Sequence, residues 1–533
     1  MKTFKNIVLI SLFQLMGLGL VQAQNFDFGL EKVHLFTDRT LYISGESLYF
    51  EAVLENAHDQ SKTLYIELIL PDGTSLLSEK QLIAQKRSSG QLQIPEDILS
   101  GVYYIKAYTK YMRNYGAKSF AYLPIKIVNP YSSEFLSGND APLFDSIKSN
   151  TFVAIDKKTN NSDAFHIALD PKEWAAFEEV FISVVPAYSF QQAHIITPKY
   201  STTLNQFFPE TRGLSLSGIL VDSMSNQPLA FKDITLSIID QKNFIPRLTD
   251  AKGRFYFALP DLTGNHDLFI STKKEDNVHP KILVDKDYDS ERISLPNPTF
   301  RLSENERKTA LDLAQSLQIT QNYYTHNTIN QLDTFLIPFY GKANNVLHLD
   351  KYIALETLEE YFTELPGLIS IKSQKKRKYF NISSPLRDMS IYNPLVLMDM
   401  VAVEDYDRIL AVSPYGIEKV DIVPQPYVYG NFIYGGIISL RSRTGDFGGI
   451  SLPKTGLFFN YDFYQAKTEL KKLNTINETP DSRNTLFSKM RVVDQEEPLE
   501  LEFKKGSSNK KYWLIVQGIN KQGEVVSKVS HLK

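Results

Sequence analysis

The residues that most often hold metals or attack substrates are sparse in this sequence. It contains no cysteine, which excludes thiol nucleophiles, disulfides and thiolate metal sites. No two histidines form an H-x-x-x-H pair, and catalytic zinc takes three protein ligands. The nine histidines are His34, His58, His166, His194, His266, His279, His326, His348 and His531. The sequence therefore predicts no metal site and no metal cofactor.

Four acidic residues alternate along one segment and could offer hard oxygen ligands to Ca²⁺. They are Asp285, Asp287, Asp289 and Glu291. An EF-hand loop in this register needs a glycine and a glutamate where the chain has Ser290 and Pro296. A calcium site stays an alternative, and the favoured interpretation is a solvated charged segment that leads into a linker.

Motifs for nucleophilic catalysis and phosphate binding are missing. Ser215 and Ser217, in GLSLSG, do not give the G-x-S-x-G spacing of a nucleophile elbow and are interpreted as strand residues. No P-loop or dinucleotide fingerprint is present after the N-terminal segment. The sequence predicts a protein that is not an enzyme and has no cofactor.

One strong basic cluster lies between two strand-like runs. It comprises Lys372, Lys375, Lys376, Arg377 and Lys378. A charged hairpin is the favoured interpretation. Contact with acidic lipid headgroups or lipopolysaccharide is the alternative, since each cation near an anionic surface contributes about 1 kcal/mol.

The composition favours a β-rich protein of several domains. The chain has 533 residues, enough for about three to five domains. Tyrosine and phenylalanine dominate the 12% of aromatic residues, and both are frequent in strands. The formal net charge of −3 provides no global field that would draw nucleic acid, so no nucleic-acid partner is expected.

The N-terminus has the three parts of an export signal. Lys2 and Lys5 precede a largely apolar stretch, 7–20, and Ala23 ends a small-residue exit. We expect residues 1–23 to be a signal peptide, with an uncleaved anchor as the alternative. No later segment is long and apolar enough for a membrane helix, so no transmembrane segment is expected after cleavage.

Three strand-like runs, separated by turn residues, lie between Pro394 and Arg443. The stretch resembles the plug domain of TonB-dependent outer-membrane receptors, in the motifs P-L-x-L-x-D-G, I-E-K-I-x-V and Y-x-x-G-x-x-x-G-G-I-I-x-I. Upstream, ALETLEEYFTELPG is similar to the helix that opens such plugs. Met400 departs from the pattern, because it replaces the glycine after the aspartate. The matching residues are Pro394, Leu395, Leu397, Asp399, Ile417, Glu418, Lys419, Val420, Tyr427, Gly430, Gly435, Gly436 and Ile438.

The resemblance implies a docking element built from aromatics and glycines. The expected docking residues are Asp399, Tyr427, Tyr429, Gly430, Phe432, Tyr434, Gly435 and Gly436. Alternation predicts that Tyr427 and Tyr429 share one face and that Phe432 and Tyr434 share another, with one pair open to a core role. The glycines are expected where the backbone turns sharply or approaches another segment closely.

The sequence patterns of the segments upstream of this stretch predict β-sandwiches. KVHLFTDRTLYISGESLYFEAVL, with GVYYIKAYT, resembles the second macroglobulin-like domain of the α2-macroglobulin family, in the form found in exported Bacteroidota proteins. It implies a sandwich over 24–130 and no covalent trapping, which needs a cysteine. Residues 131–208 are expected to form a second sandwich. LTDAKGRFYFALPDL resembles the carboxypeptidase-regulatory-like domain, a seven-stranded, non-catalytic sandwich, placed at 209–291.

The remaining segments complete the predicted domain order. Residues 292–345 are expected to be a linker with one helix, which begins at a capping box of Ser303 and Glu306. Residues 346–450 are the plug-like domain, and 451–533 a C-terminal β-sandwich. The final run, KYWLIVQGINKQGEVVSKVSHLK, resembles sorting domains of the type IX secretion pathway and fits an ordinary sandwich equally well.

The expected fold is mainly β: tandem β-sandwich domains, a small α+β plug-like domain and a C-terminal β domain. The expected function is that of a non-enzymatic adaptor, in the periplasm or associated with the outer membrane. It would dock on an outer-membrane β-barrel protein or its transport or assembly complex. The alternative is a surface-exposed glycan- or protein-binding module.

Overall fold

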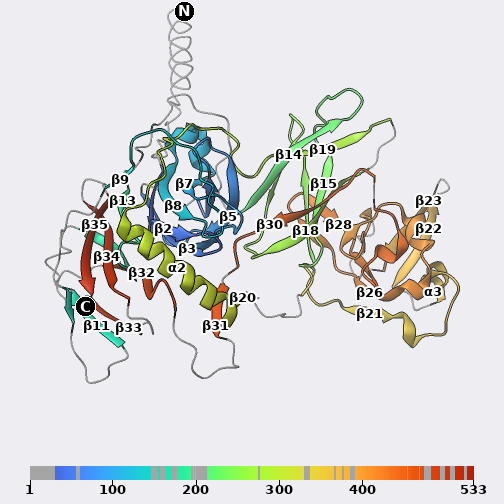
Figure 1. Ribbon diagram of the computed structural model, residues 1–533. Helices are drawn as coiled ribbons and strands as arrows, with labels where there is room; N and C mark the ends of the chain where they lie inside the picture. The colour runs from blue at the N-terminus through green and yellow to red at the C-terminus, as the bar shows by residue number, and fades with distance from the viewer. Residues whose placement is uncertain are drawn as a thin grey trace, which may run out of the picture.

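Strands dominate the computed structural model, which is mainly β as predicted (Figure 1). It describes residues 31–55, 61–145, 154–156, 164–169, 177–193, 196, 199, 213–273, 277–328, 337–364, 368–374, 377–383, 391–452, 454–466, 468–472, 482–492, 499–504, 510–520 and 525–532. The predicted signal peptide, residues 1–23, lies outside these residues. Within them, no helix combines the length and the apolar character needed to cross a membrane.

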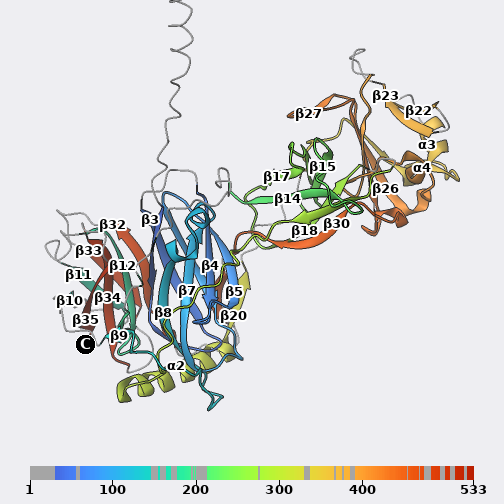
Figure 2. The ribbon, with the colours of Figure 1, turned by 90° about the horizontal axis from the view of Figure 1, so that it is seen from above.

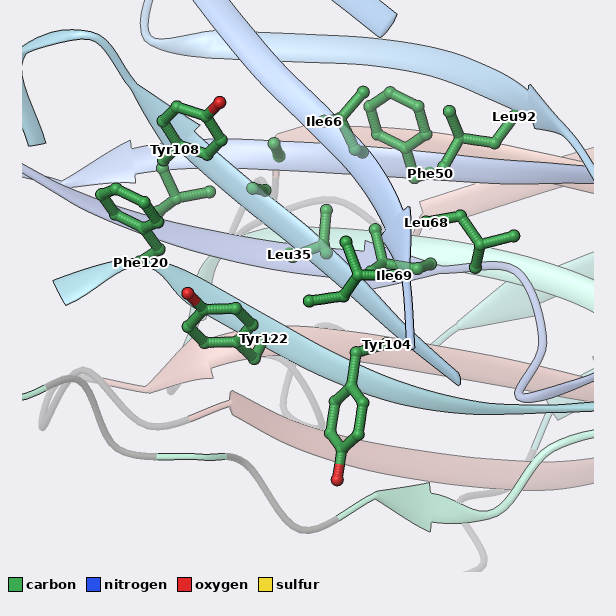
Figure 3. Packing of buried hydrophobic residues seen from close by; sticks show 14 of the residues in the cluster. Leu35, Phe50, Ile66, Leu68, Ile69, Leu92, Tyr104, Tyr108, Phe120 and Tyr122 are labelled. Carbon is green, nitrogen blue, oxygen red and sulfur yellow. The ribbon is translucent and has the colours of Figure 1, made fainter. Parts of the chain in front are cut away.

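The first sandwich encloses its core between two sheets. Alternation in β3 becomes alternate burial, and Phe50 and Leu92 meet Ile66 and Leu68 from the opposite sheet (Figure 3). One sheet has the order β1 (Lys32–Thr37), β3 (Ser47–Glu55), β6 (Arg87–Gln93). The other has the order β2 (Leu41–Ile43), β8 (Ala121–Val128), β7 (Gly101–Thr109), β4 (Thr63–Ile69), β5 (Ser75–Leu82).

The second sandwich is shared by two segments that the sequence analysis assigned to separate domains. One sheet has the order β10 (Ala154–Asp156), β11 (Ala164–Leu169), β33 (Leu499–Lys504). The other has the order β32 (Phe487–Val492), β12 (Phe177–Pro186), β34 (Tyr512–Asn520), β35 (Val525–Leu532). The prediction of independent sandwiches at 131–208 and 451–533 is therefore wrong. The physical reason is that β12 is fully buried at Val180, Ile182 and Val184 and needs a strand on each side.

The third sandwich also contains a strand from a distant part of the chain. Its sheets have the orders β17 (Arg254–Ala258), β14 (Ser215–Asp222), β19 (Pro280–Val284) and β16 (Asn243–Leu248), β15 (Asp233–Ile238), β18 (Asn265–Thr272), β30 (Leu457–Asp462). Segment 209–291 thus supplies six strands, and β30 comes from the predicted C-terminal domain. The boundaries predicted at 291 and 451 are corrected accordingly.

An α+β module, residues 337–450, is inserted between α2 and β30, and we call it the inserted module. Its mixed sheet has the order β21 (Asn345–His348), β26 (Ile417–Val423), β29 (Ile437–Ser442), β24 (Leu395–Met398), β25 (Val401–Ala402). Two hairpins and two helices complete it: β22 (Ile369–Gln374) with β23 (Arg377–Ile382), β27 (Tyr427–Tyr429) with β28 (Phe432–Tyr434), α3 (Leu358–Glu364) and α4 (Tyr406–Leu410). The charged hairpin predicted from the basic cluster is confirmed in β22–β23; Lys375 and Lys376 lie outside the described residues.

Helix α2 (Glu304–Tyr323) packs along the first two sandwiches rather than within a free linker (Figure 2). Its predicted capping box is confirmed: the Ser303 backbone N–H donates to the Glu306 carboxylate at 2.8 Å, and the Glu306 N–H donates to Ser303 Oγ at 3.3 Å. Leu313 packs on Leu41 and Ile43 of β2. Two short ladders lie nearby, β9 (Phe144–Asp145) with β13 (Gln192–Ala193) and β20 (Tyr324–Thr328) with β31 (Thr468–Lys472).

The acidic segment after β19 is a strap, residues 285–295, that lies on the first sandwich with the side chains of Asp287 and Asp289 facing inward and those of Asp285 and Glu291 exposed. Asp287 pairs with Lys80 at 2.5 Å, Asp289 pairs with Lys106 at 3.2 Å, and Leu295 joins the sandwich core. The interpretation as a solvated charged segment is therefore wrong for Asp287 and Asp289. Lys80 of β5 and Lys106 of β7 pair with these carboxylates, and the Tyr65 hydroxyl of β4 donates to Asp287 at 3.0 Å.

The strap and β30 join two bodies of the molecule. Figure 2 shows the first and second sandwiches as one body, with the third sandwich and the inserted module as the other. The Gln465 N–H donates to the Lys80 carbonyl at 2.8 Å, and the Thr63 and Tyr464 hydroxyls lie 2.9 Å apart. Glu79 lies at this junction, where burial and the nearby Asp462 charge raise its pKa to about 7.

This pKa predicts a pH-dependent stability. Between the unfolded pKa of 4.5 and about 7, folded Glu79 holds a proton that the unfolded chain has released. The contribution of protonated Glu79 to the free energy of unfolding is therefore fully present below pH 4.5. It is lost as the pH rises through about 7. We expect Glu79→Gln to raise the melting temperature at pH 8 and to change it little at pH 4.5. An equal effect at both pH values in thermal melts would contradict this.

Candidate docking site

Asp399 and Met400 form the two-residue turn between β24 and β25. Both have positive φ, 45° and 71°, a conformation that favours glycine at the position where Met400 replaces it. Met400 is buried against Phe244 of the third sandwich, and its carbonyl accepts a bond of 2.9 Å from Ser237 Oγ. The methionine side chain thus joins the inserted module to the third sandwich, which offsets the strain of its backbone.

The Asp399 carboxylate is occupied within the module. It accepts hydrogen bonds from the backbone N–H of Ser442 at 2.8 Å and of Phe447 at 2.9 Å. Asp399 therefore holds the loop after β29, and a carboxylate satisfied in this way is not presented to a partner.

All four predicted aromatics share one face of the β27–β28 hairpin. Tyr427 lies opposite Tyr434, and Tyr429 lies opposite Phe432, so their side chains project to the same side. The rings of Tyr427 and Tyr434 stack at 6.2 Å. The prediction of two separate faces is wrong, because it followed alternation through the turn and ignored the cross-strand register.

This aromatic face is turned toward the third sandwich. Tyr427 meets the ring of Phe339 at 5.1 Å, and the guanidinium of Arg247 lies 5.0 Å from the centre of the Tyr429 ring. Burial raises the pKa of Tyr427 to about 12, so its hydroxyl stays neutral at physiological pH. The four aromatics are half-buried, and the expectation that they are exposed is corrected. Their docking role stays a prediction.

The predicted glycines differ in what they do. Gly436 has φ of 122°, and a Cβ there would lie 2.7 Å from the Val423 carbonyl oxygen. Gly430 also has positive φ, in the turn of the hairpin, but a Cβ would meet nothing within 4 Å. Gly435 has no positive φ, and its N–H donates to the Asn393 carbonyl at 3.0 Å. Of the three, Gly436 carries the tightest constraint.

Replacing Gly436 with alanine should destabilise the inserted module. A positive-φ position costs a Cβ-bearing residue about 1–2 kcal/mol, and the contact with the Val423 carbonyl adds to this, so we expect at least about 2 kcal/mol. Gly416→Ala is the matched control, since that site has no positive φ and open space around it. Equal denaturant midpoints for the two variants would contradict the assignment.

A different surface of the module carries exposed aromatics, and the sequence analysis missed it. Arg443 pairs with Asp350, and its Nε donates to the Tyr415 carbonyl at 2.8 Å. Tyr415 is 71% exposed and Ile353, three residues after Asp350, is 87% exposed. We call Asp350, Tyr352, Ile353, Tyr415 and Arg443 the Arg443 surface. Tyr415 lies in a three-residue 3₁₀ helix and Tyr352 and Ile353 lie in a loop, and segments this short show no periodic pattern in the sequence.

Holding a metal or moving a proton requires titratable side chains in a suitable arrangement. The described residues contain no group of three His, Cys, Asp or Glu side chains placed to hold a metal ion. His266 pairs with Asp240, which raises the pKa of the imidazole, but its second nitrogen is 3.0 Å from the Thr263 carbonyl. Both imidazole nitrogens of His266 thus contact oxygen atoms of the protein itself.

Comparisons with known proteins add little to this description. No protein-family model and no curated protein matches the chain. Among solved structures, Salmonella alpha-2-macroglobulin reacted with methylamine is 9% identical, with 94% of this chain and 23% of that chain covered and a TM-score of 0.16. Escherichia coli alpha-2-macroglobulin activated by porcine elastase is 10% identical, with 94% and 43% covered and a TM-score of 0.21.

The chain spans less than half the length of either neighbour. Both belong to the family that the first sandwich resembles in sequence. TM-scores this low carry no argument about function, and the mainly β fold rests on the strands themselves.

Proposed function

We propose that this chain is a non-enzymatic adaptor, exported to the periplasm or the outer membrane, whose inserted module docks on an outer-membrane β-barrel protein or its complex. Residues 346–450 supply the sequence resemblance to TonB-receptor plug domains that motivates the partner. The sandwiches then act as spacers that carry the module. The mechanism of this adaptor is binding rather than chemistry.

The observation that carries the proposal is the exposed apolar surface of the inserted module. Eight of the twenty large apolar side chains exposed in the described part of the chain lie between 346 and 450, about a fifth of its length. Exposed apolar residues scattered singly need no explanation, whereas a contiguous patch marks an interaction surface, and the module carries more exposed apolar side chains than its length predicts.

The Arg443 surface has the composition of an interface anchor. Tyrosine and arginine are enriched among the residues that carry most of the binding energy, and a true anchor costs at least about 2 kcal/mol on truncation. The Arg443 side chain is oriented by its pair with Asp350 and by its bond to the Tyr415 carbonyl, which lowers the conformational entropy that this side chain would lose on binding.

The test is capture of outer-membrane proteins from detergent extracts by the full chain. We expect Tyr415→Ser with Ile353→Ser to reduce capture at least about tenfold, as the loss of one anchor implies. Leu76→Ser with Leu82→Ser is the matched control, because these exposed residues lie on β5 of the first sandwich. Unchanged capture by the Tyr415 variant would remove this surface from the proposal.

The surface-exposed glycan- or protein-binding module remains the second candidate, and the same exposed tyrosines favour it, since aromatic rings also bind sugars. Protease treatment of intact cells separates the two. A periplasmic adaptor stays protected, and a surface module is cleaved.

A further inference from the structure

The β27–β28 hairpin is attached to its module through two joints. It continues the paired strands β26 and β29, but Pro424 and Pro426 interrupt one arm and Gly435 and Gly436 the other. Proline removes a ladder N–H, and glycine at positive φ allows the chain to change direction. The hairpin is therefore an arm that extends beyond the end of the five-stranded sheet without continuing its ladder.

The arm has little stability of its own. Three residue pairs, Tyr427↔Tyr434, Val428↔Ile433 and Tyr429↔Phe432, form a two-stranded sheet with no further neighbour among the described strands. Isolated two-stranded hairpins are marginally stable in water. Its stability therefore rests on the packing of its aromatic face, with Tyr427 and Tyr434 packed against the cluster that contains Phe244, and Tyr429 against the core of the third sandwich.

Arg247 of the third sandwich and Phe339 of the inserted module contact the aromatic face of the arm. Arg247 of β16 lies over the Tyr429 ring and its Nη2 donates to the Tyr429 hydroxyl at 3.4 Å. Phe339, whose N–H donates to the Lys242 carbonyl, packs on Tyr427. The opposite face of the arm meets solvent: Val428 is 59% exposed and Ile433 40% exposed. The aromatic face of the arm is thus packed against protein, and its aliphatic face is exposed to solvent.

We infer that the hairpin is a releasable clasp: closed, its aromatic face holds the inserted module on the third sandwich, and open, it exposes that face to the module's partner. Contacts of Arg247 and Phe339 then act as an autoinhibitory cover. The inference that the open arm presents its aromatic face to a partner rests on the proposed docking function. The inference that the arm opens and closes concerns this chain alone.

Opening of the clasp is measured without a partner. The chain has no cysteine, so Val428→Cys with Leu248→Cys places two nitroxide labels on exposed sites of the arm and the third sandwich. We expect a short inter-label distance as the main population, and a second, longer one in Arg247→Ala. Hydrogen exchange should show the β27 and β28 amides opening faster than those of β26 and β29.

One distance population in both proteins, with exchange as slow as in β26, would overturn the clasp. The Arg247→Ala protein must keep its melting temperature within a few degrees, so that release is separated from unfolding. Lys252→Ala is a matched control, because Lys252 is an exposed cation of the same sandwich away from the hairpin contacts.

The autoinhibitory part is tested by locking the arm. Arg247→Cys with Tyr429→Cys, joined by a short bismaleimide, should reduce capture of outer-membrane proteins about tenfold relative to the unjoined protein, a usual size for coupled sites. Equal capture by joined and unjoined protein would overturn autoinhibition while leaving docking intact. If no version captures a partner, the proposed function fails, and the label distances still decide whether the clasp opens.

Discussion

Replacing Asp287 with alanine is expected to destabilise the protein by about 3–5 kcal/mol, the usual cost of removing one partner of a buried ion pair. Lys80, 1% exposed, would be left with a buried charge and no carboxylate partner. Asp287 also accepts hydrogen bonds from the hydroxyls of Tyr461 at 2.7 Å and Tyr65 at 3.0 Å. Burial alone would raise the pKa of Asp287, but the Lys80 charge holds it below its usual value.

A control from the same acidic series separates burial from charge. Asp285 pairs with Arg254 at 2.5 Å, but both side chains are more than a third exposed. Asp285→Ala should therefore cost only about 0–1 kcal/mol. Urea unfolding of the two variants makes the comparison, and a loss below about 1 kcal/mol for Asp287→Ala would return the strap to a solvated segment.

A double variant shows whether the charge itself is the cause. Lys80→Met with Asp287→Leu removes both charges and keeps apolar volume at the junction. Replacing a buried pair by apolar residues is often neutral, so the double variant should be more stable than Asp287→Ala. If the double variant is the less stable of the two, the tyrosine hydrogen bonds rather than the ion pair dominate the site.

Local features of this fold were predictable because short-range chemistry decides them. The alternation in residues 48–54 became the buried face of β3, and Ser303 with Glu306 formed the capping box. The β22–β23 hairpin likewise followed from two strand-like runs around a basic turn. Each of these signals lies within about ten residues of chain.

The pairing of distant strands was not predictable in the same way. Strands β12 and β34 are separated by more than three hundred residues, and their apolar patterns are equally compatible with two small sandwiches. Which edge receives which strand depends on packing across the whole domain, not on propensity. The insertion of residues 337–450 hid the link between β18 and β30 for the same reason.

In the candidate docking site, too, local features were predictable and contacts between distant segments were not. The turn at Asp399 and the glycine at 436 were recognisable as special backbone positions. The common face of Tyr427 and Tyr434 depends on the register across the turn, and its cover by Phe339 depends on a segment almost ninety residues earlier. The strained Met400 makes sense only once its contact with Phe244 is seen.

Truncating the chain before Tyr512 is expected to unfold the second sandwich. Strand β34 lies between β12 and β35, so its removal uncovers Val180, Ile182 and Val184 on one sheet. Limited proteolysis with mass spectrometry should then find new cleavage within 154–193. A separate C-terminal sandwich, or a dispensable sorting domain, would instead leave this region as resistant as in the full chain.

Point variants in β34 distinguish the effect of lost core packing from the effect of a shortened chain. Leu514 is completely buried in the core of the second sandwich, and Leu514→Ala should cost about 2–5 kcal/mol. Lys511, exposed at the start of the same strand region, is the control, and Lys511→Ala should change stability by no more than about 0.5 kcal/mol. The Leu514 variant should also increase cleavage within 154–193, because the two segments share one core. Loss of the C-terminal strands alone, with β12 still protected, would show that the two segments fold independently after all.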